Sequence, residues 1–206
     1  QQAQMETLEP QTPIELLDLP WITTERFRTA VSEFKPGKAP GPDEFRAECL
    51  QALDNNTIKY INTLYKASIS LAYVPQSWRE VEVIFIPKPG KTDYTEMRSF
   101  RPISLMSVLF KTLERMTLWH IEEKVLLHKP IHRNQFGFRK GKSTEHALSK
   151  TVNIIEKGLY QGQYVLGVFC DISGAFDNVT LASITSSMRD RGIDDSIIQW
   201  YDHFLQ

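Results

Sequence analysis

The strongest constraint on the fold is a long run of apolar side chains at helical spacing. The run comprises Leu105, Val108, Leu109, Thr112, Leu113 and Met116. Intervals of three and four residues place these side chains on one face, which predicts an amphipathic helix over about residues 104–126. Shorter periodic stretches predict further helices over about residues 43–54, 57–73, 147–159, 180–190 and 194–205. Since each apolar face must pack against another element, helices dominate the expected architecture.

The first helix is expected to begin after Thr23 or Thr24, either of which can cap it. Its apolar face would consist of Phe27, Ala30, Val31 and Phe34. The segment KPGKAPGPD then ends it, because three prolines and two glycines break helices. Residues 1–21 contain three prolines and little periodicity, so they are predicted to be a tail or linker. Residues 22–206 are predicted to form the folded domain.

Two apolar segments are typical of β-strands. Residues 81–86 are rich in valine, isoleucine and phenylalanine, and Pro87 is expected to end this strand. Residues 164–170 form a continuous apolar run with β-branched and aromatic members, which predicts a strand buried on both faces, with Cys170 inside. The expected fold class is therefore α+β, or α/β with helices dominating.

A carboxylate, Asp171, directly follows this predicted buried strand. A charge at the edge of an apolar core is costly unless it is hydrated, paired or bound to metal. Asp171 can simply cap the turn that follows, as Asp177 and Asn178 can cap the helix expected near Thr180. Alternatively, the strand end holds the carboxylate as a ligand for Mg²⁺, with the backbone amides of residues 172–175 facing a phosphate group. The residues alone leave both interpretations open.

The charge of the chain favours nucleic acid only locally. The formal net charge is −1, which gives no overall attraction to phosphate. Basic residues gather in two segments, which contain Lys88, Lys91, Arg98 and Arg101, and Arg133, Arg139, Lys140 and Lys142. Each segment is either a solvated loop or a phosphate-binding patch. Arginine can bind a phosphate through two parallel hydrogen bonds. Arg101 and a metal-binding Asp171 would therefore be two parts of a nucleotide site.

Cysteine content and hydropathy indicate in which cellular compartment the protein is found. Cys49 and Cys170 are the only cysteines, too few for a disulfide framework or a zinc pattern. No apolar run approaches the ~20 residues that a membrane span requires. The first residues, QQAQMETLEPQTP, lack the basic and apolar regions of a signal peptide. The sequence therefore predicts a soluble intracellular protein of the cytoplasm or nucleus, without membrane attachment.

Five blocks of the sequence, in this order, resemble the reverse transcriptase of non-LTR retrotransposons. The blocks are FKPGKAPGPD, VEVIFIPKPGK, RSFRPISLMSVLFKTLER, NQFGFRKGKSTEHAL and FCDISGAFDNV. They are most similar to the jockey and R1-type elements of insects, and the resemblance runs from about Ile22 to the last residue. It implies a right-hand polymerase, of which this chain would contain the fingers and the first part of the palm.

The resemblance implies roles for individual residues. Asp171 would be a catalytic residue and a ligand of Mg²⁺, and Phe176 would exclude ribonucleotides by crowding the 2′-hydroxyl. Arg101 would contact the phosphates of the incoming deoxynucleoside triphosphate, with Lys88 assisting.

The block that contains Phe136 and Phe138 would belong to the fingers. Arg139 and Lys140 would bind the phosphates of the template strand, and Phe136 or Phe138 would pack or stack nearby. The implied partners are an RNA template, a DNA primer and deoxynucleoside triphosphates.

The chain also departs from the family pattern. Glu44 stands where family members usually have glycine after GPD. No ADD sequence, which would mark the paired aspartates of the later palm hairpin, occurs in this chain. Two-metal chemistry needs carboxylates on both sides of the metal pair. The chain alone is therefore expected to be inactive, whatever the activity of the complete protein.

Two alternatives to a polymerase follow from the same residues. One is a non-catalytic nucleic-acid-binding remnant of a mobile element, which would keep the basic segments without the chemistry. The other is a phosphatase that forms an aspartyl phosphate. It fits less well, because Ser173 stands where a second acid is expected two residues after Asp171.

Overall fold

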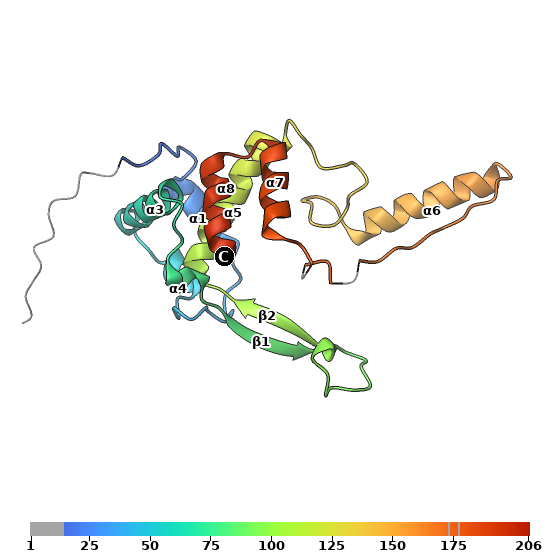
Figure 1. Ribbon diagram of the computed structural model, residues 1–206, viewed down its shortest axis with the longest axis horizontal. Helices are drawn as coiled ribbons and strands as arrows, with labels where there is room; N and C mark the ends of the chain where they lie inside the picture. The colour runs from blue at the N-terminus through green and yellow to red at the C-terminus, as the bar shows by residue number, and fades with distance from the viewer. Residues whose placement is uncertain (1–14, 173, 177) are drawn as a thin grey trace, which may run out of the picture. The chain divides into compact units, whose positions relative to one another are not determined.

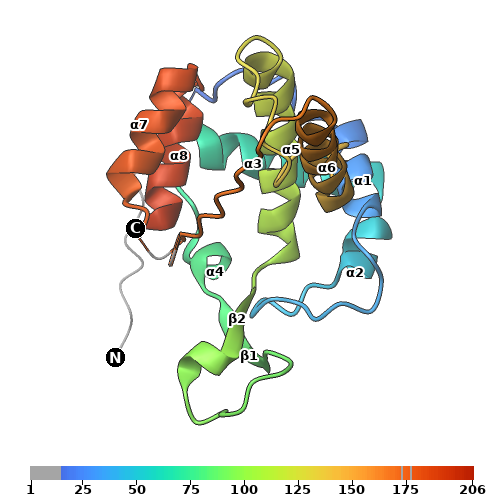
Figure 2. The ribbon, with the colours of Figure 1, turned by 90° about the vertical axis from the view of Figure 1, so that its right-hand side faces the viewer.

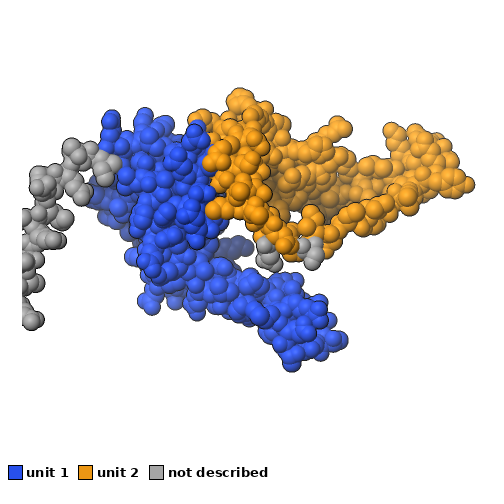
Figure 3. Space-filling view, viewed as in Figure 1, with its two compact units in different colours: residues 1–119, 194–206 blue, residues 120–193 orange. Residues whose placement is uncertain are grey.

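The computed structural model describes residues 15–172, 174–176 and 178–206. The chain divides into two compact units, coloured separately in Figure 3. Unit 1 contains the chain up to Trp119 together with Asp194–Gln206, and unit 2 contains His120–Ile193. The predicted tail lies outside the described residues as far as residue 14. Residues 15–22 have no helix or strand, but they bury Leu19, Trp21 and Ile22 against unit 1.

Unit 1 is mainly helical (Figure 1). Its helices are α1 (Thr24–Ser32), α2 (Ala47–Gln51), α3 (Asn55–Ser70), α4 (Gln76–Arg79), α5 (Val108–Ile121, of which the last two residues fall in unit 2) and α8 (Asp195–Leu205). The predicted cap of α1 is confirmed, because Thr23 Oγ1 accepts a hydrogen bond from the Arg26 amide at 3.1 Å. The Asp54 carboxylate caps α3 in the same way, and the hydrogen bonds that it accepts from Thr57 and Asn56 lower its pKa.

The core of unit 1 is an aromatic cluster contributed by α1, α3, α4, α5 and α8. Its rings belong to Phe27, Tyr65, Trp78, Phe110, Trp200 and Phe204. The Tyr65 hydroxyl donates a hydrogen bond to the Leu109 carbonyl at 2.7 Å, so this buried polar group is satisfied. Burial raises the pKa of Tyr65. The core thus joins helices that are distant in sequence, since α8 packs against α3.

A two-stranded antiparallel ribbon, formed by β1 (Glu82–Pro87) and β2 (Phe100–Leu105), extends from the helices of unit 1 (Figure 2). The strand β1 was predicted, but both of its faces are exposed. The strand β2 was not predicted, because Pro102 interrupts the segment. Proline is tolerated here because each strand of a two-stranded ribbon is an edge strand. Since β2 occupies residues 100–105, α5 begins at Val108 rather than near residue 104.

Unit 2 contains a π-helical turn, η2 (Glu122–Leu126), and the helices α6 (Thr144–Tyr160) and α7 (Leu181–Arg191). The helix predicted over residues 104–126 therefore ends in a π turn. Ser143 caps α6 by accepting a hydrogen bond from the His146 amide at 3.2 Å. Gly192 ends α7 in the left-handed conformation that glycine favours. The predicted helices over residues 147–159, 180–190 and 194–205 correspond to α6, α7 and α8.

The prediction of a buried strand over residues 164–170 is wrong. In the described part of unit 2 these residues form no ladder with another strand, and their side chains are exposed, including Cys170. The segment instead returns along α6, where the Gln163 amide donates to the Gly158 carbonyl at 2.9 Å and a Val165 methyl lies over Gly158. A β-strand needs a hydrogen-bonded neighbour, and the apolar run alone does not supply one.

Candidate nucleotide and nucleic-acid interface

The ribbon β1–β2 places Lys88 and Arg101 on the same face. Ile86 pairs with Arg101, and the Lys88 amide donates to the Ser99 carbonyl at 2.8 Å, which continues the ladder. Directly opposite residues share a face of an antiparallel pair, and so do residues two apart in one strand. The two predicted phosphate-binding side chains therefore start from one side of the ribbon.

The two side chains differ in what they already bind. The Lys88 ammonium donates to the Arg98 carbonyl at 2.8 Å, so part of its hydrogen-bonding capacity is used within the loop that joins the strands. Arg101 is exposed, and its guanidinium makes no hydrogen bond or ion pair with any residue that the structure describes. Arg101 is thus the more available of the two cations for an external phosphate.

The loop between the strands is held by its own hydrogen bonds. The Tyr94 hydroxyl donates to the Lys88 carbonyl at 2.8 Å, and the Tyr94 ring meets Phe100 edge-on. The Asp93 carboxylate accepts hydrogen bonds from the amide and hydroxyl of Thr95, which lower the pKa of Asp93. These contacts fix the backbone near Lys88.

In unit 2, Asp171 is exposed and precedes turn residues at positions 174–176 and 178. Gly174 has a φ of 61°, and its carbonyl accepts from the Asn178 amide at 3.0 Å. Phe176 projects from this turn with 83% of its surface exposed, so it is not a core residue. Ser173, which stands where a second acid would be expected, and Asp177, a predicted helix cap, lie outside the described residues.

The predicted template-binding loop lies in the same unit and contacts this turn. The rings of Phe138 and Phe176 meet edge-on, with centroids 6.3 Å apart. Arg139 Nη1 donates to the His132 carbonyl at 3.1 Å, which ties the loop together. Lys140 is exposed, and its ammonium has no partner among the residues described. The structure thus brings Phe176 to the loop that carries Arg139 and Lys140, whereas Lys88 and Arg101 belong to unit 1.

The described residues do not assemble a metal site. Across residues 15–172, 174–176 and 178–206, no three histidine, cysteine, aspartate or glutamate side chains gather closely enough to hold an ion. Asp171 offers one carboxylate. Mg²⁺ is usually bound through one or two carboxylates together with substrate phosphates, so Asp171 fits a partial set of ligands.

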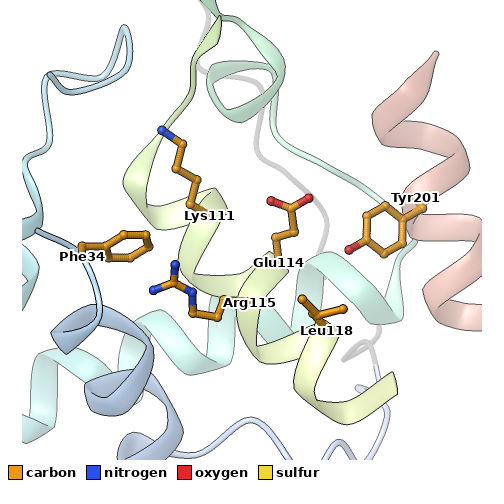
Figure 4. A pocket seen from close by; sticks show the side chains of 6 residues that line it. All are labelled: Phe34, Lys111, Glu114, Arg115, Leu118 and Tyr201. Atoms are coloured by element: carbon orange, nitrogen blue, oxygen red, sulfur yellow. The ribbon is translucent and has the colours of Figure 1, made fainter. Parts of the chain in front are cut away.

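Sequence reasoning missed a pocket of about 400 Å³ in unit 1, shown in Figure 4. It is lined by Phe34, Lys111, Glu114, Arg115, Leu118 and Tyr201. Burial raises the pKa of Glu114, against smaller opposing effects of Lys111 and Arg115. The Arg115 guanidinium lies 4.3 Å from the centre of the Phe34 ring and donates to the Ala30 carbonyl at 2.9 Å.

Arg115 of α5 thus contacts both α1 and Phe34, and the charged side chains that line the pocket are half-buried. The signal in the sequence was the series Lys111, Glu114 and Arg115, which interrupts an apolar helix with charges.

Comparison with known proteins identifies the family. A model described as reverse transcriptase (RNA-dependent DNA polymerase) matches residues 86–206. The chain belongs to the reverse transcriptase family. The matched range includes all six candidate site residues, namely Lys88, Arg101, Arg139, Lys140, Asp171 and Phe176.

Individual relatives of this reverse transcriptase come from mobile elements of flies. The chain is 31% identical over 163 residues to the RNA-directed DNA polymerase from mobile element jockey of Drosophila melanogaster, which is 79% of this chain and 18% of that protein. It is 35% identical over 142 residues to the probable RNA-directed DNA polymerase from transposon X-element of the same species, covering 69% of this chain and 16% of that protein.

The resemblance to non-LTR retrotransposon reverse transcriptases is thereby confirmed. The matched part covers less than a fifth of the length of each of these two relatives. Among its described helices, none is both long enough and apolar enough to cross a membrane.

Proposed function

We propose that this chain forms the fingers and the first part of the palm of an RNA-directed DNA polymerase. The observation that carries the proposal is the family match over residues 86–206, a range that includes each candidate residue. The complete protein would extend a DNA primer on an RNA template with deoxynucleoside triphosphates.

The availability of each side chain supports its proposed role. Arg101 projects an unpaired guanidinium from one face of the ribbon and would bind the phosphates of the incoming nucleotide. Lys88, which already donates to the Arg98 carbonyl, would assist through its charge. Phe176, exposed on its turn, would lie against the sugar and exclude a 2′-hydroxyl.

Asp171 would hold Mg²⁺ together with carboxylates that the described part of this chain does not provide. The ion, when bound, neutralises charge on the transferring phosphate group. Since Asp171 alone cannot complete a two-metal site, we propose that this chain is inactive by itself.

A primer-extension assay with an RNA template, a DNA primer, Mg²⁺ and deoxynucleotides tests this proposal. No extension is expected from the isolated chain. Extension that disappears in Asp171→Ala would show that the chain contains a complete active site, contrary to the proposal.

Template binding is tested separately, by the anisotropy of a fluorescent single-stranded RNA titrated with the chain at several salt concentrations. Weak binding that decreases with salt is expected, because phosphate contacts release counterions. Lys140→Glu is the informative variant, since the structure describes no residue that pairs with the Lys140 ammonium. Arg139→Glu would also break the hydrogen bond to His132.

A matched control is Lys59→Glu on α3, which makes the same change in net charge at an exposed position of unit 1. Equal loss of RNA binding in Lys140→Glu and Lys59→Glu would mean that only net charge matters, and the template assignment would then be wrong.

A further inference from the structure

Helix α3 carries apolar side chains on two of its faces. The inner face contributes Ile58, Tyr65 and Ile69 to the core, and none of the three is accessible to solvent. The outer face carries Tyr60 and Leu64 and continues to Leu71, the residue that caps the helix, and the exposed fractions of the three are 76%, 61% and 49%. An exposed row of large apolar side chains on a well-packed helix often marks an interaction surface.

The outer side chains follow the spacing of a helix-pairing seam. Tyr60, Leu64, Ala67 and Leu71, here called the α3 stripe, are separated by four, three and four residues. At 100° per residue they fall within roughly 60° of the helix circumference. This alternation of four and three is the spacing of the apolar positions in a coiled coil. The stripe extends over about three turns of helix.

The surroundings of the stripe are uncharged. Asn56, Thr63 and Ser70 run along one side of it, and α3 contains no acidic residue. The two lysines of the helix, Lys59 and Lys66, lie roughly 100° or more away from the centre of the stripe.

At the end of the helix the apolar surface continues. The Leu17 amide donates to Ser70 Oγ at 2.9 Å, and the Leu17 side chain is exposed.

We propose that the α3 stripe is a contact between two copies of this chain, with the two α3 helices antiparallel. The spacing is symmetric about the midpoint of the stripe. A two-fold axis through that midpoint places Tyr60 against Leu71 of the second copy, and Leu64 against Ala67 of the second copy. A large side chain faces a smaller one in each layer, as efficient packing requires. The neutral residues at the edge bring no like charges together, and two-fold pairing is the commonest form of self-association.

The size of the stripe determines how strong this contact is. The exposed portions of one tyrosine and two leucines amount to roughly 300 Å² per copy. Stable dimers usually bury about 800 Å² per partner. The contact is therefore a weak, rapidly exchanging one, and its detection requires trapping at high protein concentration.

Disulfide trapping between two variants tests the register. In a background of Cys49→Ser and Cys170→Ser, which removes the two native thiols, Leu64→Cys protein is mixed with Ala67→Cys protein and oxidised glutathione. Covalent dimers of mixed composition are expected to outnumber dimers of either variant alone at least several-fold. Lys59→Cys, on the same helix but away from the stripe, is the matched control and is expected to cross-link little with any variant.

The pattern of cross-links decides the outcome. Leu64→Cys cross-linking mainly with itself would indicate parallel pairing and overturn the proposed geometry. Equal cross-linking at Lys59→Cys would indicate non-specific association, and no cross-linking at any position would show that a second copy does not occupy the stripe. Adding Tyr60→Glu to the Leu64→Cys and Ala67→Cys proteins is expected to abolish the mixed dimer, because it buries a charge without a partner.

Discussion

Trp200 donates a hydrogen bond from its indole nitrogen to Ser68 Oγ at 2.9 Å, which links α8 to α3 across 132 residues of sequence. Trp200 is completely buried and stacks on Phe110 of α5, so the hydrogen bond lies inside the aromatic core of unit 1. Ser68 Oγ also contacts the Tyr73 carbonyl, which follows the end of α3. One hydroxyl thus satisfies the buried indole of Trp200 and the part-buried carbonyl of Tyr73.

Ser68→Ala is expected to lower the free energy of unfolding by about 1–3 kcal/mol, because it leaves the buried indole N–H without an acceptor. Urea denaturation followed by tryptophan fluorescence measures the change. Ser70→Ala, two residues along the helix, removes a hydroxyl that binds an exposed segment at Leu17 and is expected to cost much less. Equal losses in the two variants would contradict the importance of the buried bond.

Gly41→Ala is expected to destabilise unit 1 by a few kcal/mol. A Cβ at this position would lie 2.5 Å from the Met106 carbonyl carbon and 2.6 Å from the Ser107 nitrogen. Both are backbone atoms, so the clash could be relieved only by a shift of the backbone. The loop over residues 35–43 would therefore separate from the start of α5. Lys38→Ala in the same loop is a control with no expected effect, and the midpoint of thermal unfolding is a sufficient measurement.

Glu44→Gly is expected to stabilise the protein by about 0.5–1 kcal/mol. Glu44 has a φ of 58°, in the left-handed region that is costly for residues with a Cβ, and its side chain is exposed. This is the position where the family usually has glycine, so the departure in the sequence coincides with local backbone strain. Glu44→Ala keeps the Cβ and is expected to give little stabilisation. A gain of equal size in Glu44→Ala would assign the effect to the charge instead.

Glu114→Gln is expected to increase stability near about pH 7, with a gain that shrinks as the pH falls towards the ordinary pKa of 4.5. Burial raises the pKa of this carboxyl, so the folded protein binds its proton more tightly than the unfolded chain does. The stability that the protonated carboxyl provides is complete below the unfolded pKa, and it is lost as the pH rises through the folded value. Urea denaturation over a range of pH tests this, with the exposed Glu82→Gln as control. A gain that is independent of pH would contradict it.

The helices could be predicted because each carries its own periodic pattern, as Phe27, Ala30 and Val31 do in α1. Strands depend on neighbours that the local sequence does not specify. The apolar run ending at Cys170 therefore appeared to be a core strand, whereas Pro102 concealed a strand that pairs along its whole length with β1.

The same distinction applies to the candidate site. Arg101 and Lys140 were predicted from the sequence to bind phosphate, and both side chains are exposed. The contacts that occupy Lys88 and Arg139 were not predicted, because both bind backbone carbonyls whose positions depend on how the loops fold.

The role proposed for Phe176 is testable in a polymerase completed with the downstream region of a jockey relative. Phe176 is exposed at the turn that follows Asp171, with its ring edge-on to Phe138. If the ring lies against the sugar, a 2′-hydroxyl would overlap with it. Phe176→Ala is then expected to raise the kcat/KM for ribonucleotides relative to deoxyribonucleotides by about tenfold or more, with a smaller loss in overall rate.

Three further variants separate this role from its alternatives. Asp171→Ala is expected to abolish incorporation of both sugars, since it removes a metal ligand. Arg101→Ala is expected to raise the nucleotide concentration required while leaving sugar selection unchanged, because the guanidinium would contact phosphate and not ribose. Phe138→Ala tests whether the neighbouring ring merely supports Phe176, in which case selectivity decreases only in part. If the ratio of kcat/KM for the two sugars is the same in Phe176→Ala as in the unsubstituted enzyme, Phe176 does not select the sugar, and its contact with Phe138 serves only to hold the turn against the loop.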